Sequence, residues 1–192
     1  MFSWWVEKLI EVEVKIPVED LSVVRDLLDK IGGIKKWELS RIKLDAYYNH
    51  PCRNFSVTDE ALRVRDSDGR THSLTYKGPK LSLKTKTRVE INLQLSNGDL
   101  MNDILEKLGF VKVASITKSR EWWRLRDSNV YLDEVEDLGN FIEVEHEVED
   151  EKKIKEAENR ILKLIKLLRL SAESVTRKSY LELFLEKRMK FP

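Results

Sequence analysis

The sequence is poor in residues that cross-link a chain or interrupt regular structure. Its 192 residues include one cysteine, Cys52, four prolines and seven glycines. A single cysteine cannot form a disulfide within the chain, so we expect an intracellular, cytoplasmic protein held together by its apolar core. No apolar run reaches the roughly 20 residues that span a membrane, and the N-terminus lacks the basic flank of a signal peptide. The sequence therefore predicts no membrane association.

An excess of charge of one sign is also missing. The 35 basic and 34 acidic residues leave a net charge of +1, so neither a broad polyanion-binding surface nor a nucleic-acid partner is expected. Charged residues nevertheless make up 36% of the chain, so the fold must place many charges of both signs. The length suits one domain over residues 1–192, whose central region spans about 9–185. A chain of this length can bury a sizeable apolar core.

Strict alternation of apolar and charged residues is the clearest structural signal. In residues 9–16, LIEVEVKI, apolar side chains alternate with Glu11, Glu13 and Lys15, which is typical of a strand with one apolar and one polar face. Similar patterns predict further strands at 35–48, 61–66, 71–77, 87–95, 110–126, 130–135 and 141–148. Apolar residues at helical spacing predict helices at 19–31, 99–108, 151–170 and 174–187.

The order of these elements contains a weak internal repeat. A strand, a helix ending in DLLDKIGG and further strands in the first half resemble a strand, a helix ending in DILEKLGF and further strands in the second half. This repeat favours one barrel built from two half-units. The predicted fold class is α+β: a single-domain, closed antiparallel β-barrel with a polar, charged lumen, surrounded by α-helices.

Charges of opposite sign occupy different strands. Carboxylates dominate the strand that contains Glu11 and Glu13 and the segment EVEHE at 143–147, whereas cations dominate the others. A solvated sheet face would explain any one strand by itself. Glutamates two residues apart share a face and repel each other, a cost that a bound cation offsets. Segregation therefore favours a lumen in which carboxylates hold a divalent ion while arginine and lysine bind phosphate.

An ordered set of motifs accompanies this pattern. ExExK occurs as Glu11-Val12-Glu13-Val14-Lys15, and is followed by ALRVR at 61–65, KGP at 77–79, RVE at 88–90, KSR at 118–120, LD at 132–133, LGNFIEVE at 138–145 and SYLEL at 179–183. Together they resemble the CYTH superfamily of triphosphate tunnel metalloenzymes, which includes class IV adenylyl cyclases, thiamine triphosphatases and inorganic triphosphatases. The resemblance extends over about residues 9–185, nearly the whole chain.

The resemblance implies a role for each charged position. The metal ligands, for Mg²⁺ or Mn²⁺, would be Glu11, Glu13, Asp133, Glu143 and Glu145. The triphosphate would be bound by Lys15, Arg63, Arg65, Lys77, Arg88, Lys118, Arg120 and Lys178, the last closing one end of the tunnel. The catalytic group would be Lys15, Glu90 and Arg120, with Glu90 orienting the cations or helping to position a nucleophile.

One position conflicts with simple alternation. Asp133 is out of register with Glu134 and Glu136, so only one of these two sets can face the lumen unless a bulge intervenes. The resemblance favours Asp133. The three histidines have no spacing typical of a metal site with one another or with Cys52, and a Walker-type glycine loop is absent.

The reaction is left open by the residues. Hydrolysis of ATP, tripolyphosphate or thiamine triphosphate is the favoured prediction, because no residue can be assigned to reading an adenine base. A class IV adenylyl cyclase that forms cyclic AMP and pyrophosphate is the alternative. A non-catalytic module that binds nucleotide or polyphosphate is the second alternative. The predicted assembly is a monomer or a homodimer.

Overall fold

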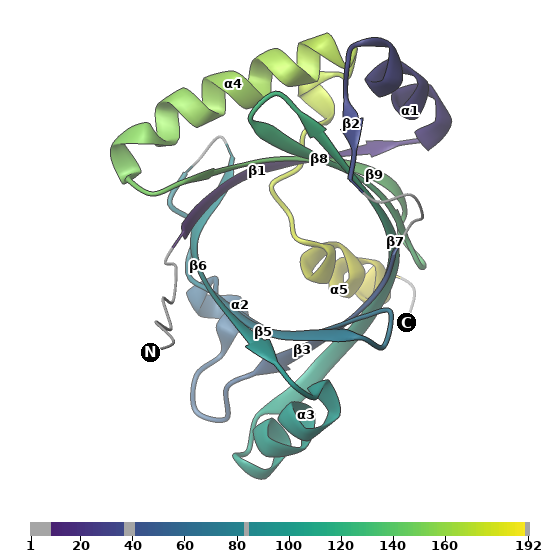
Figure 1. Ribbon diagram of the computed structural model, residues 1–192. Helices are drawn as coiled ribbons and strands as arrows, with labels where there is room; N and C mark the ends of the chain where they lie inside the picture. Colours follow the sequence, from purple (N-terminus) through teal and green to yellow (C-terminus); the bar gives the residue numbers. More distant parts are fainter. Residues whose placement is uncertain (1–8, 37–40, 83–84, 191–192) are drawn as a thin grey trace, which may run out of the picture.

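The computed structural model describes residues 9–36, 41–82 and 85–190 of the chain. In these ranges nine strands form one antiparallel sheet in the order β2-β7-β3-β4-β5-β6-β1-β9-β8, and an additional β7–β8 pairing closes eight of them into a barrel (Figure 1). The strands are β1 Leu9–Val18, β2 Ile34–Lys35, β3 Arg41–Asn49, β4 Ala61–Ser67, β5 Thr71–Lys77, β6 Lys86–Leu95, β7 Val111–Leu125, β8 Ser128–Val135 and β9 Gly139–Val148. The predicted closed antiparallel barrel is therefore confirmed.

Strand register turns the alternating pattern into a charged lumen. In β1 the apolar set is buried between barrel and helices, with Val12 and Val14 at 0% and 1% exposure. Glu13, on the opposite face, lies across from Lys86 of β6 and Glu145 of β9. Because alternate side chains of a strand point to opposite faces, the charged residues that share this parity on neighbouring strands project inward.

The helices surround the barrel and occupy one part of its interior. In the described ranges they are α1 Leu21–Lys30, α2 Phe55–Thr58, α3 Gly98–Lys107, α4 Ile154–Leu167 and α5 Tyr180–Lys190, with 3₁₀ turns at Glu151–Lys153 and Ala172–Ser174. Helices α1 and α3 follow β1 and β6, which pair with each other. The four-residue helix α2 is absent from the sequence-based prediction.

The last helix begins later than the helical pattern indicates. Residues 174–187 predict its position, but the helix starts at Tyr180. Ser179 and Glu182 form a capping box: the Ser179 backbone N–H donates to the Glu182 carboxylate at 2.7 Å, and the Glu182 N–H donates to the Ser179 hydroxyl at 3.1 Å. These bonds satisfy backbone donors at the first turn and fix the helix start.

Three apolar clusters hold the helices in place. Helices α1 and α4 pack on the outer face of β1, β8 and β9, and α3 packs on β3 to β5. Helix α5 lies within the ring of strands in Figure 1, where Tyr180 and Phe184 pack against the inward-facing Tyr47 and Phe141. The helix therefore fills part of the barrel interior and leaves the remainder as a cavity.

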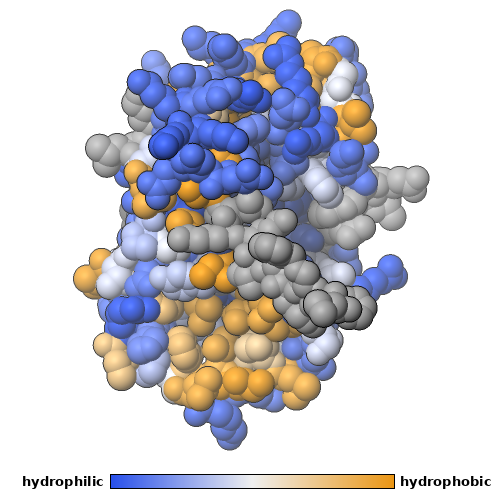
Figure 2. Space-filling view, turned by 60° about the vertical axis from the view of Figure 1, so that its left-hand side comes forward, coloured by the Kyte–Doolittle hydropathy of each residue, from blue (hydrophilic) through white to orange (hydrophobic). Residues whose placement is uncertain are grey.

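The two ends of the surface differ in polarity. An apolar region covers the α3 end of the molecule, whereas mostly hydrophilic side chains cover the opposite end (Figure 2). Exposed apolar residues of β6 and of α3 and its end include Leu93, Leu100, Ile104 and Leu108. Among the described helices, none combines the length and the apolar character required to cross a membrane.

Candidate functional site

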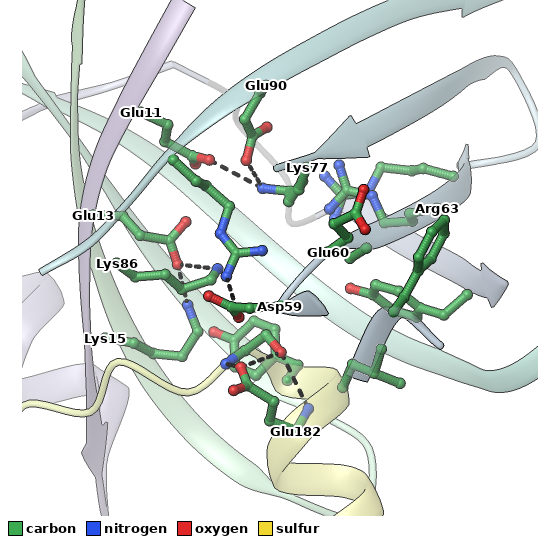
Figure 3. Close-up of a pocket in the computed structure, with 18 of the residues that line it drawn as sticks. Glu11, Glu13, Lys15, Asp59, Glu60, Arg63, Lys77, Lys86, Glu90 and Glu182 are labelled. Atoms are coloured by element: carbon green, nitrogen blue, oxygen red, sulfur yellow. Dashed lines mark hydrogen bonds and ion pairs between the residues drawn. The ribbon is translucent and has the colours of Figure 1, made fainter. Parts of the chain in front are cut away.

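A cavity of about 500 Å³ lies inside the barrel, bounded by the strands and by α5. Charged side chains from many strands point into it (Figure 3). The cavity lining includes most of the predicted site residues, namely Glu11, Glu13, Lys15, Arg63, Arg65, Lys77, Arg88, Glu90, Lys118, Arg120, Glu143 and Glu145. A volume of this size falls in the range of about 300–1,000 Å³ that is usual for small-molecule sites.

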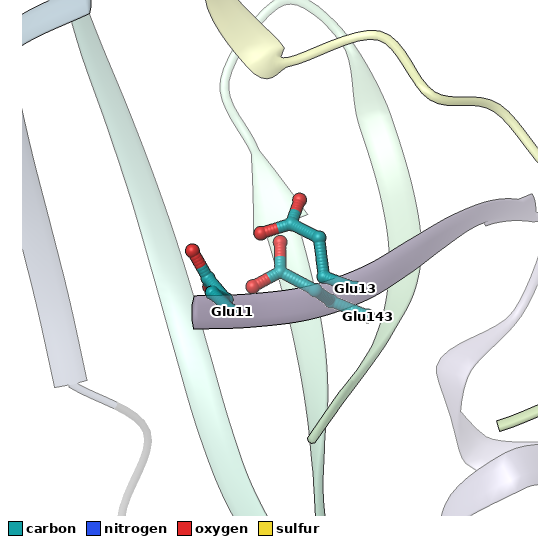
Figure 4. A group of neighbouring side chains, drawn as sticks. All are labelled: Glu11, Glu13 and Glu143. Carbon is teal, nitrogen blue, oxygen red and sulfur yellow. The ribbon is translucent and has the colours of Figure 1, made fainter. Parts of the chain in front are cut away.

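Three carboxylates converge at the wall formed by β1 and β9 (Figure 4). One oxygen from each of Glu11, Glu13 and Glu143 lies within 4.8 Å of the others. Hard cations such as Mg²⁺ and Mn²⁺ prefer oxygen ligands of this kind. The donor set therefore fits the divalent ion that the sequence predicts, and these three residues could hold it.

Glu145 reinforces the case for a cation. It lines the same cavity, and its carboxylate accepts a hydrogen bond of 3.3 Å from Asn129. Burial, followed by the charge of Glu11, raises the pKa of Glu145 well above its usual value. A divalent ion at this wall would favour the ionised form of Glu145 and so offset the cost of crowding these carboxylates.

Two lysines lie against the same carboxylates. The Lys15 ammonium donates to Glu13 at 3.1 Å and forms an ion pair with Glu143. Burial opposes its charge, but Glu13 and Glu143 outweigh burial and raise the pKa of Lys15 above its usual value. Lys86 donates to Glu13 at 2.7 Å. Both lysines are therefore positioned to bind an anion beside the acidic wall.

Lys86 is absent from the sequence-based site. The strand was predicted to begin at residue 87, whereas β6 begins at Lys86. Extending the alternation of Arg88 and Glu90 back by one step would have placed Lys86 on the inward face. It is 6% exposed and lines the cavity.

Cations from β4, β5 and β6 form the next part of the wall. The side chains of Arg63 and Arg88 each have a buried Nε without a hydrogen-bond partner among the described residues. Lys77 donates to Glu11 at 3.0 Å and forms an ion pair with Glu90. Burial opposes ionisation of Glu90, but the charge of Lys77 lowers its pKa to about 2. Orphaned guanidinium donors in a cavity are the groups that a phosphate would satisfy.

Strand β7 supplies Lys118 and Arg120 from the other side of the acidic wall. Arg120 donates to Glu143 at 2.9 Å. Burial, followed by the charge of Arg120, lowers the pKa of Lys118 to about 7. The charge of Lys118 therefore changes near neutral pH, and an arriving polyanion would favour its protonated form.

Asp133 faces inward, as the resemblance favoured, while Glu134 is exposed. The structure does not bring Asp133 to the three converging glutamates. Its carboxylate accepts bonds of 2.6 and 2.5 Å from Arg120 and one of 2.8 Å from the Tyr180 hydroxyl. This side chain has no exposed surface and three partners, including Lys118 at 3.3 Å. It is not one of the three convergent carboxylates, so its role as a metal ligand stays a prediction.

Asp45 occupies an equivalent position on β3. Its carboxylate accepts bonds of 2.5 and 2.6 Å from Arg65 and lies 3.8 Å from Arg63. Asp45 stands before an aromatic pair in the segment LDAYY at 44–48, and the sequence analysis assigned no role to it. The available signal was its position. Asp45 lies on the strand next to ALRVR, and its side chain points to the same inward face as Arg63 and Arg65.

Lys178 is the predicted site residue that the structure places elsewhere. Its side chain is 48% exposed and pairs with Glu186 at 2.7 Å, and it is not among the residues that line the cavity. Lys80 instead bridges the rim of the cavity, with its ammonium 2.7 Å from Asp59 and 3.0 Å from Glu182 of α5. Sequence analysis missed Lys80 because it lies in a loop without periodicity.

The fold and the site define a class of protein: closed antiparallel barrels whose lumen carries an acidic wall flanked by cations. The chain belongs to the CYTH domain family, whose family model matches residues 9–180. It is 39% identical over 175 residues to "Putative adenylate cyclase MJ0240" of Methanocaldococcus jannaschii, covering 91% of this chain and 98% of that protein.

Solved structures share the fold. A protein from Pyrococcus horikoshii OT3 is 39% identical, with a TM-score of 0.83, and the match covers 93% of this chain and 99% of that one. A Hippeastrum protein described as a "putative adenylyl cyclase" with a dominant triphosphatase activity is 19% identical, with a TM-score of 0.63, covering 93% and 96%. At that identity the likeness concerns the fold alone.

Proposed function

We propose that this protein is a divalent-metal-dependent enzyme that hydrolyses a triphosphate inside the barrel. The observation that carries the proposal is the convergence of Glu11, Glu13 and Glu143 within 4.8 Å, in a cavity whose other walls supply arginines and lysines. A metal-binding carboxylate group facing phosphate-binding cations is the arrangement that phosphoryl transfer requires.

The roles of the chain's own residues follow from their positions. Glu11, Glu13 and Glu143, with Glu145 beside them, would hold Mg²⁺ or Mn²⁺, which when bound supplies charge neutralisation to the phosphate oxygens. Arg63 and Arg88 have unpaired Nε donors and would bind phosphate oxygens.

The remaining cations of the lumen would complete the binding of the substrate. Lys15, Lys86, Lys118 and Arg120 flank the acidic wall and would hold the triphosphate in line for attack by water. Electrostatic stabilisation of this preorganised kind is the main source of catalysis in such reactions.

Cyclisation of ATP is the second candidate. The specific observation in its favour is the 39% identity to the protein from M. jannaschii that is named as an adenylate cyclase. The same cavity would then bind ATP so that the ribose 3′-hydroxyl, and not water, meets a phosphorus atom, with pyrophosphate as the leaving group.

Product analysis distinguishes the reactions. The protein is incubated with ATP, tripolyphosphate or thiamine triphosphate, each with Mg²⁺ or Mn²⁺. Release of inorganic phosphate supports hydrolysis, and cyclic AMP with pyrophosphate supports the cyclase. Tight binding with no turnover of any of the three would leave only a binding module and would overturn the proposal.

A further inference from the structure

Tyr180, the first residue of α5, contacts two of the phosphate-binding lysines at once. Its side chain is 4% exposed and lines the cavity. The Lys15 ammonium lies 4.4 Å from the centre of its ring and the Lys118 ammonium 4.7 Å from it. Both distances are within the roughly 6 Å over which a cation is attracted to an aromatic face.

The ring joins parts of the wall that the sheet itself does not. Lys15 belongs to β1 and Lys118 to β7, and these strands are separated by β9 and β8 in the barrel. Two ammonium groups near one another repel. An aromatic face stabilises positive charge without cancelling it, whereas an additional carboxylate would neutralise it. Tyr180 can therefore keep both lysines in place and leave them attractive to phosphate.

The tyrosine hydroxyl fixes the ring in this position. It donates to Asp133 at 2.8 Å, and Asp133 also holds the Arg120 guanidinium through two bonds. The capping box of Ser179 and Glu182 sets where α5 begins. The first turn of α5 is thus connected through Tyr180 to the three cations Lys15, Lys118 and Arg120.

We propose that Tyr180 is a positioning residue for the triphosphate: its ring aims Lys15 and Lys118 into the cavity, and its hydroxyl fastens that arrangement to Asp133 and Arg120. This inference rests on the proposed function. Helix α5 is accordingly a part of the binding site and more than a cover for the barrel.

The chain offers a matched control on the same helix. Phe184 lies one turn beyond Tyr180 and packs in the same apolar cluster. Its recorded ring contact is with Arg188, at 4.8 Å, and it does not line the cavity. Phe184→Leu therefore tests the effect of loosening α5 without removing the ring from the lysines.

The test compares Tyr180→Leu, Tyr180→Phe and Phe184→Leu, with tripolyphosphate and Mg²⁺ as the probe. We expect Tyr180→Leu to raise KM, and the Kd measured by calorimetry, about ten-fold, as fits a desolvated cation–aromatic contact. Tyr180→Phe keeps the ring and should remain within about three-fold of the parent protein, since only one hydrogen bond is lost. Phe184→Leu should lower the melting temperature and leave KM unchanged.

A spectroscopic measurement reports on the geometry without any activity. The Nζ atoms of Lys15 and Lys118 lie over the face of the ring, so NMR should show the adjacent ε-methylene protons shifted upfield in the parent protein and in Tyr180→Phe. Absence of these shifts, or a KM that responds equally to Tyr180→Leu and Phe184→Leu, would overturn the inference. If Tyr180→Leu does not fold, Tyr180→Phe tests the inference instead. Loss of the upfield shifts or of affinity in that variant would overturn it.

The outcome also separates this inference from the proposed function. A parent protein that neither binds nor hydrolyses any triphosphate, but shows the upfield shifts, refutes the proposed function and with it the role in substrate binding. A parent protein that hydrolyses tripolyphosphate, with a folded Tyr180→Leu variant of equal affinity, refutes the role of Tyr180 alone.

Discussion

The inward-facing carboxylates of the barrel form two groups with opposite surroundings. Asp45 and Asp133 each lie directly across from an arginine of a neighbouring strand, Arg65 and Arg120 respectively, and each binds it at two points. The glutamates of β1 instead lie between other glutamates on β9 and cations on β6. Glu147 of β9 and Arg88 of β6 are opposite Glu11, and Glu145 of β9 and Lys86 of β6 are opposite Glu13.

The difference shows which carboxylates are available to a ligand. An aspartate held at two points by a guanidinium orients that cation and has fewer lone pairs free for a metal ion. Like charges directly opposite each other on a sheet are destabilising. Burial, followed by the charge of Glu11, raises the pKa of Glu145. We therefore propose that the aspartates support the cations and that the glutamates bind the metal.

Loss of one metal-binding glutamate should have the largest effect on activity. Glu13→Gln removes a charged oxygen donor from the convergent group and weakens the pairing of Lys15 and Lys86. We expect kcat/KM for the hydrolysed triphosphate to fall at least about 100-fold, measured over a titration with Mn²⁺. Glu134→Gln, on the outer face of β8, is the control. An active Glu13→Gln variant with unchanged metal dependence would show that the metal site is assigned wrongly.

Stability should separate the two groups of carboxylates. Asp133→Asn leaves the buried Arg120 short of charge compensation and should lower the free energy of unfolding by about 3 kcal/mol. Glu145→Gln should be neutral or stabilising in metal-free protein. A carboxyl whose pKa is raised by folding loses stability as pH rises above its unfolded value, and glutamine removes that penalty. Denaturant titration at pH 7 measures the free energy of unfolding of both variants. Equal destabilisation by Asp133→Asn and Glu145→Gln would show that the two groups of carboxylates do not differ.

Arginine with an unpaired donor should matter for affinity more than for folding. Arg88→Met removes a guanidinium whose Nε lacks a partner among the described residues. We expect the Kd for tripolyphosphate to rise about ten-fold, as is usual for a lost charge-assisted contact, with little change in stability. Arg88→Lys keeps the charge without the planar fork and should give an intermediate value. Unchanged affinity in both variants would remove Arg88 from the site.

The smallest effect should be a pH dependence due to Lys118. Its pKa of about 7 means that above pH 7 the free protein must take up a proton when the triphosphate binds. Affinity should therefore fall about three- to ten-fold between pH 7.5 and 8.5. Calorimetry in two buffers of different ionisation enthalpy measures the uptake. Lys118→Met should abolish it, and an unchanged uptake in that variant would identify another group.

The same lowered pKa has a consequence for stability with the opposite trend. Between pH 7 and 10.5 the unfolded chain binds a proton at Lys118 that the folded chain does not. The contribution of this group to the free energy of unfolding therefore rises with pH across that range.

The sequence predicted the barrel because period-two alternation survives in almost every strand. It also placed Glu11, Glu13 and Glu143 correctly on an inward face. Pairing between strands is not encoded in any single segment, so alternation could not reveal that Asp133 lies across from Arg120 and is already occupied. Lys178 belongs to an irregular segment before α5, where no period fixes the direction of a side chain. Lys80 was missed for the same reason. Tyr180 lies in the predicted helix and in the motif SYLEL, but nothing in the sequence shows that the start of this helix enters the barrel.

The ring closure of the barrel has a consequence for how the site comes into being during folding. Lys15 and its partner Glu143 are 128 residues apart in the chain, whereas β4, β5 and β6 form a local meander that can pair early. Contacts of such long separation are slow to form, because the loop entropy is lost before the contact stabilises the chain. The acidic wall is thus completed only when the first strand and the ninth meet, so the carboxylates that we propose as metal ligands come together late in folding.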